Sequence, residues 1–385
     1  MSNKSIFKKA LLSSAILSAS LPAFASNDAG MIESLTGFNI NDTSFVKDSG
    51  LEVGLWASAG ATYTSHNRSD RNNAPLSFND RNNEVLLNQF NLFIERSVNS
   101  NGNSWDIGGR IDVMFGTDAQ NTQAAGWDGK LTNGSYYDFA VPQMYAEVYA
   151  PIGNGITAKI GHFYTSIGYE VVTSPDNFFY SHAYTMLYAE PFTHTGVSFS
   201  YDIDDNFSIN AGAVQGWDNV GTNNEAWSFL GGASWTSDDE GSSVVVQVVS
   251  GDLSDEFSGN TTMYSLVASH DLSDKLHYVF QHDYGVQRVG PKTDWYGINQ
   301  YLTYDVSEQM QYGVRLEWFG DKGDAQRVNA VGANYFAVAA GVNYSPVNWM
   351  TFRPEVRYDR ADEKVFNDNS ETDQVSIAMD VVINF

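Results

Sequence analysis

The last twelve residues of the chain, 374–385, read Gln-Val-Ser-Ile-Ala-Met-Asp-Val-Val-Ile-Asn-Phe. Every second residue is apolar, and those between are small or polar with one exception; the apolar set is Val375, Ile377, Met379, Val381, Ile383 and Phe385. Strict alternation over this length is typical of a β-strand with one apolar face. A final strand that ends on an aromatic residue fits a membrane barrel whose last strand pairs with its first. Such a barrel needs an even number of similar strands and an export signal before them.

The first 25 residues have the three parts of a signal peptide. A basic start is followed by an apolar core interrupted by serines and then by Ala-Phe-Ala, which ends at Ala25. We expect cleavage after Ala25 and export of the rest of the chain. Residues 26–50 show no alternation and are predicted to be a periplasmic lead-in, whereas 51–385 are predicted to form the barrel.

The composition excludes several classes of protein. The chain has no cysteine, which rules out disulfides and metal–thiolate sites. Mean hydropathy is −0.30, and after the leader there is no apolar run near the roughly 18 residues that a spanning helix needs. Charged residues make up only 17% and aromatic residues reach 14%, a combination that favours a lipid-facing surface with aromatic girdles. The formal charge of −25, which becomes −28 once the three lysines of the leader are removed, argues against nucleic acid as a partner.

Sixteen stretches share the alternating pattern and are predicted to be strands of an antiparallel up-and-down barrel. They are joined alternately by short turns and longer loops, as in outer-membrane barrels, with both chain ends on one side. The predicted strands are 51–63, 84–96, 104–115, 139–150, 155–163, 192–203, 207–217, 226–237, 242–251, 260–271, 275–285, 295–306, 309–319, 333–344, 348–360 and 374–385.

The polar faces of these strands carry charges that a dry core would not tolerate. In the third strand Arg110 and Asp112 alternate with Ile111 and Val113. Burying such charges between two sheets would be costly, whereas a water-filled lumen solvates them. The alternation therefore favours a channel over a β-sandwich.

One long connection has an unusual composition. Between Tyr164 and Pro191 the chain includes Gly-Tyr-Glu at 168–170, Pro-Asp-Asn at 175–177 and Phe-Phe-Tyr at 178–180. An exposed loop does not need this many aromatic residues, so we expect this third long loop to fold into the lumen and narrow it. The alternative is an outward cap packed on itself.

Four segments in and around this loop resemble the OmpL-like putative beta-barrel porin family of proteobacteria. They are 159–164 (Lys-Ile-Gly-His-Phe-Tyr), 167–170 (Ile-Gly-Tyr-Glu), 177–181 (Asn-Phe-Phe-Tyr-Ser) and 190–196 (Glu-Pro-Phe-Thr-His-Thr-Gly). The resemblance is strong over about 141–217 and elsewhere consists of the strand rhythm. It implies an outer-membrane porin and does not assign a solute. His182 departs from the pattern, because an arginine is expected at that position.

The phase of each strand identifies candidate residues for a charged pore constriction. Our hypothesis is that basic wall residues face acidic residues of the loop and create an electric field that sorts ions. The wall candidates are Arg110, Lys159, Arg315, Arg353 and Arg357, and the loop candidates are Glu170, Asp176 and Glu190. The alternative is that these charges are simply solvated in the lumen.

An enzyme is the competing class, because some outer-membrane barrels hydrolyse lipids or peptides. His162 and Ser166 suggest a dyad, yet four residues of extended strand separate their Cα atoms by about 13 Å. The sequence contains no Gly-x-Ser-x-Gly, phosphate-loop or His-Glu-x-x-His motif. We therefore predict no catalytic residue, cofactor or metal. A surface adhesion or structural barrel remains a further alternative.

The sequence thus predicts a porin of the cell outer membrane that lets small hydrophilic solutes or ions diffuse passively. Its expected partners are outer-membrane lipid and lipopolysaccharide. A homotrimer is expected only by analogy with porins of this size.

Overall fold

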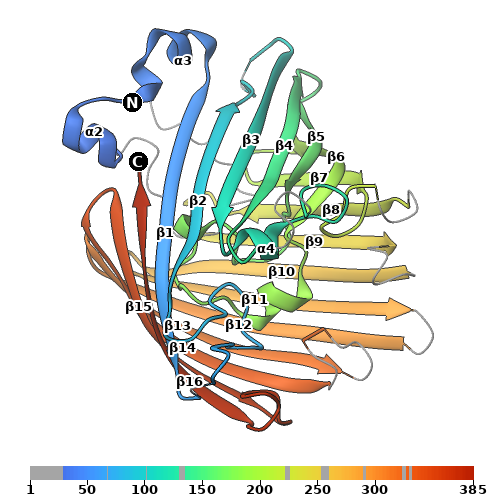
Figure 1. Ribbon diagram of the computed structural model, residues 1–385. Coiled ribbons are helices and arrows are strands. Elements are labelled where there is room, and N and C mark those ends of the chain that lie inside the picture. The colour runs from blue at the N-terminus through green and yellow to red at the C-terminus, as the bar shows by residue number, and fades with distance from the viewer. Residues whose placement is uncertain are drawn as a thin grey trace.

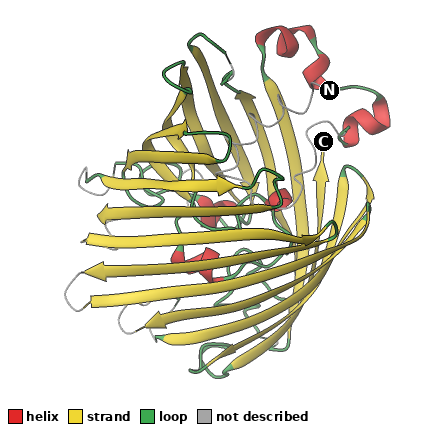
Figure 2. Cartoon of the chain, turned by 180° about the vertical axis from the view of Figure 1, so that it is seen from behind, coloured by secondary structure: helices red, strands yellow, loops and turns green. Residues whose placement is uncertain are grey.

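The chain forms one closed antiparallel barrel in which every strand pairs with its neighbours in sequence and β1 pairs with β16 (Figures 1 and 2). The computed structural model describes residues 29–66, 68–100, 102–129, 135–221, 226–252, 260–288, 292–322, 327–328 and 332–385. The strands are β1 Glu52–Thr64, β2 Val85–Arg96, β3 Asp106–Gly116, β4 Asp138–Ala150, β5 Ile156–Tyr164, β6 Thr193–Asp202, β7 Phe207–Val214, β8 Ser228–Thr236, β9 Ser242–Asp252, β10 Asn260–Ser273, β11 Leu276–Arg288, β12 Lys292–Ser307, β13 Met310–Lys322, β14 Ala333–Val347, β15 Met350–Ala361 and β16 Asp373–Asn384.

The predicted all-β barrel of sixteen strands is confirmed, including the pairing of the last strand with the first. The pairs of β1 and β16 run from Trp56 with Asn384 to Thr64 with Ser376. Strand ends differ by a few residues from the predicted ones. For example, β7 ends at Val214, because the chain turns at Gly216 and Asp218, which both have positive φ.

The alternation in β16 separates two environments. Val375, Ile377 and Met379 are exposed on the outer surface, whereas Ser376 and Asp380 are buried inside the barrel. The buried carboxylate of Asp380 forms an ion pair with Arg353 of β15, so its charge is compensated inside the barrel. The period-two pattern therefore decides which side chains meet the interior and which meet the surroundings.

The third long loop folds back into the barrel (Figure 2), which confirms its predicted inward course. Here L3 denotes residues 165–192, which contain the one-turn helix η2 Ser174–Asp176 and the π-helical turn η3 Thr185–Ala189. L1 denotes residues 65–84, most of which are polar. Leu76 and Phe78 of L1 are nevertheless buried. The second long loop contains α4, Ala119–Thr122.

The lead-in consists of α2 Met31–Thr36, η1 Ile40–Asp42 and α3 Ser44–Ser49. It lies beside the start of β1, at the end of the barrel where the described part of the chain begins and ends (Figure 1). The predicted signal peptide, 1–25, lies outside the described residues. In the part of the chain that is described, no helix is both long and apolar enough to cross a membrane.

Candidate channel constriction

L3 is fixed to one side of the barrel by a buried ion pair. The guanidinium of Arg315 on β13 donates to Glu170 Oε1 at 2.6 Å, to the Ser181 carbonyl at 2.6 Å and to Ser181 Oγ at 3.1 Å. Glu170 also accepts from the Tyr301 hydroxyl and from the Ala183 amide. Because Arg315 bonds both ends of the segment 170–181, it closes this part of the loop against the wall.

The Glu170 carboxyl has an unusual environment. Its burial raises the pKa, but the nearby Arg315 guanidinium and the His182 imidazole, whose Nδ1 lies 3.6 Å from Oε2, lower it more, so that the pKa falls to about 2. Glu170 is therefore charged at neutral pH although almost no water reaches it. Its charge therefore stabilises the docked position of L3 and does not act mainly on ions in the lumen.

Two further arginines, both on β15, hold the backbone of L3. Arg353 donates to the carbonyls of Ser174 and Asn177 at 2.7 and 2.6 Å, and Arg357 donates to the His182 carbonyl at 2.6 Å. Each also pairs with a carboxylate of the wall, Asp380 for Arg353 and Asp359 for Arg357. These arginines reach the carbonyl groups of the loop rather than its carboxylates.

Wall carboxylates complement this arrangement by accepting amide hydrogens of L3. Glu355 on β15 accepts from the amides of Tyr180 and Ser181 at 3.0 and 3.2 Å. Glu317 on β13 accepts from the Thr185 amide at 2.8 Å. Backbone groups that would be costly to bury without partners are thereby satisfied, and charged partners make strong bonds.

The end of L3 brings two carboxyl groups together. The side-chain amide of Gln281 donates both to Glu190 Oε1 at 2.5 Å and to Asp283 Oδ1 at 3.0 Å. Burial, together with the negative charge of Asp283, raises the pKa of Glu190 well above its ordinary value. Glu190 therefore favours its neutral form. Gly168 has φ +90°, and a Cβ there would lie 2.0 Å from Glu190 Oε2, so only glycine fits this contact.

L1 packs on L3. The Phe78 ring meets the His182 ring edge-on, with centroids 4.6 Å apart, and also contacts the ring of Phe192. The Tyr188 hydroxyl donates to the Pro75 carbonyl. The two loops therefore form one packed unit inside the barrel.

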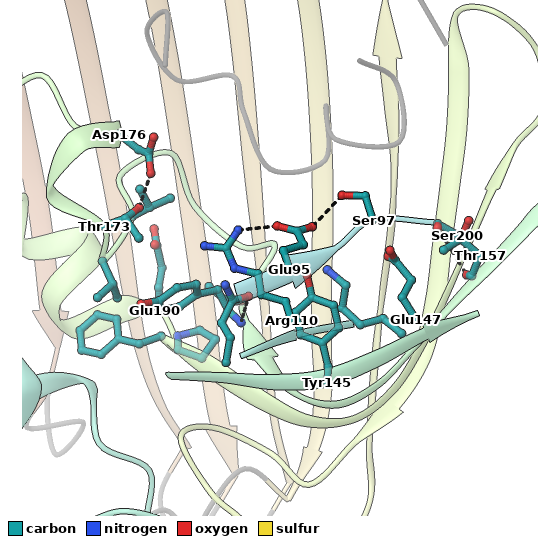
Figure 3. A pocket seen from close by; sticks show the side chains of 18 of the residues that line it. Glu95, Ser97, Arg110, Tyr145, Glu147, Thr157, Thr173, Asp176, Glu190 and Ser200 are labelled. Carbon is teal, nitrogen blue, oxygen red and sulfur yellow. Dashed lines mark hydrogen bonds and ion pairs between the residues drawn. The ribbon is translucent and has the colours of Figure 1, made fainter. Parts of the chain in front are cut away.

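A cavity of about 510 Å³ lies between L3 and the strands β2–β6 (Figure 3). The loop contributes Glu170, Asp176 and Glu190, and the wall contributes Glu95, Arg110, Tyr145, Glu147 and Lys159. Arg315, Arg353 and Arg357, which hold the loop from β13 and β15, are not part of this lining.

Opposite charges alternate on the wall of this cavity. Arg110 donates to Glu95 at 2.8 Å and to Asp112 at 2.6 Å (the Glu95 bond is drawn in Figure 3). Lys159 places its ammonium 4.4 Å from the centre of the Tyr145 ring, and its cross-strand partner on β4 is Glu147. On the loop, Asp176 accepts from the Thr173 hydroxyl at 2.5 Å, and burial raises the pKa of its carboxyl.

The eight candidate residues thus divide into two groups. Arg110, Lys159, Glu170, Asp176 and Glu190 line the cavity, whereas Arg315, Arg353 and Arg357 are buried beneath L3. Glu95, Glu147 and Tyr145 also line the cavity and are not among the residues predicted from strand phase. The signal for them was present, because Glu95 faces Arg110 and Glu147 faces Lys159 in cross-strand pairs of opposite charge.

The two side chains considered as a hydrolytic dyad, His162 and Ser166, are not hydrogen-bonded to each other, and Ser166 Oγ is buried without a hydrogen-bond partner among the described residues. His162 Nδ1 lies 2.8 Å from the Thr195 hydroxyl, and its ring lies beside Trp127. His194 Nε2 lies 3.0 Å from the Thr165 hydroxyl, which also accepts from the Ile167 amide and so shapes the start of L3. No group of three or more acidic or histidine side chains that could hold a metal occurs among the described residues.

In a comparison with protein families, residues 50–385 match the family of putative beta-barrel porin-2, OmpL-like. The chain belongs to this OmpL-like porin family. A comparison with curated protein sequences finds no match to this chain. Membership indicates an outer-membrane porin, with the outer-membrane location of such barrels in Gram-negative bacteria.

Solved structures share the fold of this OmpL-like porin at low sequence identity. OprB of Pseudomonas putida has a TM-score of 0.63 at 10% identity, covering 94% of this chain and 100% of that one. The anion-selective porin from Comamonas acidovorans has 0.61 at 9%, covering 87% and 99%. The outer membrane channel DcaP of Acinetobacter baumannii has 0.58 at 13%, covering 87% and 97%. At these identities the likeness concerns the barrel alone.

Proposed function

We propose that this OmpL-like porin is a passive diffusion channel for small hydrophilic solutes or ions, and that the space between L3 and β2–β6 is its constriction. The observation that carries the proposal is the asymmetric position of L3. The loop is bonded to β13 and β15 and, through Gln89, to β2, whereas its face toward β3–β6 borders a cavity with charged walls. A solute that passes the loop on this side meets the charged side chains of Arg110, Lys159, Glu95 and Glu147.

The charges of the cavity favour cations. Its lining includes five carboxyl groups and two basic side chains. Glu170 is neutralised by Arg315, and Glu190 favours its neutral form because of its raised pKa. Glu95, Glu147 and Asp176 then face Arg110 and Lys159, which leaves an excess of acidic groups. We propose a modest preference for cations.

Reversal potentials across planar bilayers test this proposal with refolded protein. One unit charge about 5 Å from the ion path changes the energy of a monovalent ion there by about 0.8 kcal/mol in water. This energy corresponds to a roughly four-fold change in the local concentration of that ion. Glu147→Gln should therefore lower the preference for cations, and Lys159→Gln should raise it. Arg360→Gln is the control, because Arg360 lies exposed on the outer face of β15.

An absence of channels would refute the function. If channels form but Glu147→Gln and Lys159→Gln have the same reversal potential as Arg360→Gln, the protein is a porin whose ion path does not pass through this cavity.

No covalent step, catalytic residue or cofactor belongs to the proposed mechanism. The protein is proposed to reside among outer-membrane lipid and lipopolysaccharide and to assemble as a homotrimer. Chemical cross-linking in native membranes measures the oligomeric state, and a single monomeric band would contradict the trimer.

A further inference from the structure

The lead-in before β1 exposes large apolar side chains that the barrel does not cover. Leu35 of α2, Phe38 in the following turn and Phe45 of α3 are 69%, 54% and 77% exposed. No residue of α2 is buried, and in α3 only Val46 is. Two short helices with this composition are not held together by an apolar core of their own.

The lead-in is nevertheless fixed to the rim of the barrel. The Asn41 side chain donates to the Val53 carbonyl at 3.1 Å and accepts from the Val53 amide at 2.8 Å. Val53 precedes Trp56, the first residue of β1 that pairs with β16, so the Asn41 amide satisfies backbone groups left free at the edge of the strand. The Leu51 amide also donates to the Val46 carbonyl.

The exposed side chains continue the outer surface of the barrel. The Phe385 ring packs against that of Phe90 on the outer face of β2, with centroids 6.3 Å apart. Gly30, where α2 begins, has its backbone directly against Phe385. Both views show α2 and α3 beside the wall at this end rather than across the opening (Figures 1 and 2). The apolar residues of the lead-in thus extend a surface that already faces hydrocarbon.

We propose that the segment 31–49 docks on the phospholipid leaflet at the periplasmic face of the outer membrane and anchors the rim of the barrel there. Apolar side chains on short helices gain free energy by entering the headgroup and acyl boundary, while charged residues such as Lys47 and Asp48 stay in water. The inference rests on the membrane location described above and is independent of conduction.

Site-specific fluorescence can test the docking because the chain has no cysteine. Phe45→Cys and Leu35→Cys are labelled with an environment-sensitive dye in vesicles of phosphatidylethanolamine and phosphatidylglycerol. Lys47→Cys, on the opposite side of α3, is the aqueous control, and Leu92→Cys, exposed on the outer face of β2, is the lipid control. Retention of the barrel is checked by heat-dependent migration on a denaturing gel.

We expect spin-labelled lipid to quench the dye at positions 45 and 35 at least about two-fold more strongly than the dye at position 47. Aqueous iodide should quench the dye at positions 45 and 35 less than the dye at position 47. Equal iodide access at 45 and 47 would overturn the proposal. If neither quencher reaches the dye at position 45, and unlabelled Phe45→Cys forms disulfides between copies of the chain, the surface serves self-association and the proposal is wrong. A dye at 92 that lipid does not quench would refute the membrane location as well.

Discussion

Replacing Arg315 with methionine should weaken the docking of L3 on the wall while the barrel stays intact. Arg315 is fully buried, and its pair with Glu170 at 2.6 Å is supported by two bonds to Ser181. Removing one partner of a buried pair costs about 3–5 kcal/mol, because the other charge remains without compensation. At about 1.4 kcal/mol per factor of ten, the population of undocked loop should rise by roughly 100-fold to 4,000-fold.

Hydrogen exchange with mass spectrometry measures this change directly, since amides of L3 exchange through local undocking. In Arg315→Met, amides of 170–185 should exchange at least about 100-fold faster, whereas strand amides should not change. The double variant Arg315→Met/Glu170→Met should recover part of the protection, because no buried charge is left unpaired. Arg360→Met is the matched control.

Single-channel records of Arg315→Met should also show larger current fluctuations as the loop moves. If exchange in L3 and the current noise both match those of Arg360→Met, the ion pair does not hold the loop and the reasoning above is wrong.

Three further predictions concern neighbouring contacts of the loops. Burial and the charge of Asp283 raise the pKa of Glu190, so its contribution to docking is complete below the ordinary pKa of about 4.5 and is lost as pH rises toward the docked pKa. Loop fluctuations should therefore increase as pH rises above about 4.5. Glu190→Gln, which cannot ionise beside Asp283, should remove this dependence in noise analysis. Gly168→Ala should weaken docking by about 1–3 kcal/mol because φ is +90° and the new methyl group meets Glu190, an effect that hydrogen exchange would detect and that normal protection would contradict. Phe78→Ala should loosen L1 from His182 by about 3–5 kcal/mol and increase protease cleavage within L1, while unchanged cleavage would show that L1 is held elsewhere.

The strands were predictable because each one repeats a local rule. In 374–385 the side chains alternate between hydrocarbon and lumen, and neither environment depends on distant parts of the chain. The inward course of L3 was also readable, since Phe178, Phe179 and Tyr180 need apolar surroundings and all three are buried in the structure. Composition therefore indicated that the loop packs inside the barrel.

The division of the charged residues could not be obtained in this way. Phase places Arg110 and Arg353 alike on the lumen side, yet Arg110 borders the cavity and Arg353 bonds loop carbonyls. The difference depends on which wall L3 contacts, and that is a tertiary property of a segment without periodicity. The burial of Phe78 in L1 escaped prediction for the same reason, because a polar loop gives no sign that two of its residues meet another loop.

Cysteine scanning during single-channel recording tests the position of the constriction most directly. Thr157→Cys on β5 lines the cavity, whereas Asn299→Cys on β12 lies fully buried against L3, where Thr185 contacts it. A charged thiol reagent should reduce the current stepwise at position 157 and leave it unchanged at position 299. Current loss at 299 with none at 157 would place the open path on the other side of the loop and contradict the account.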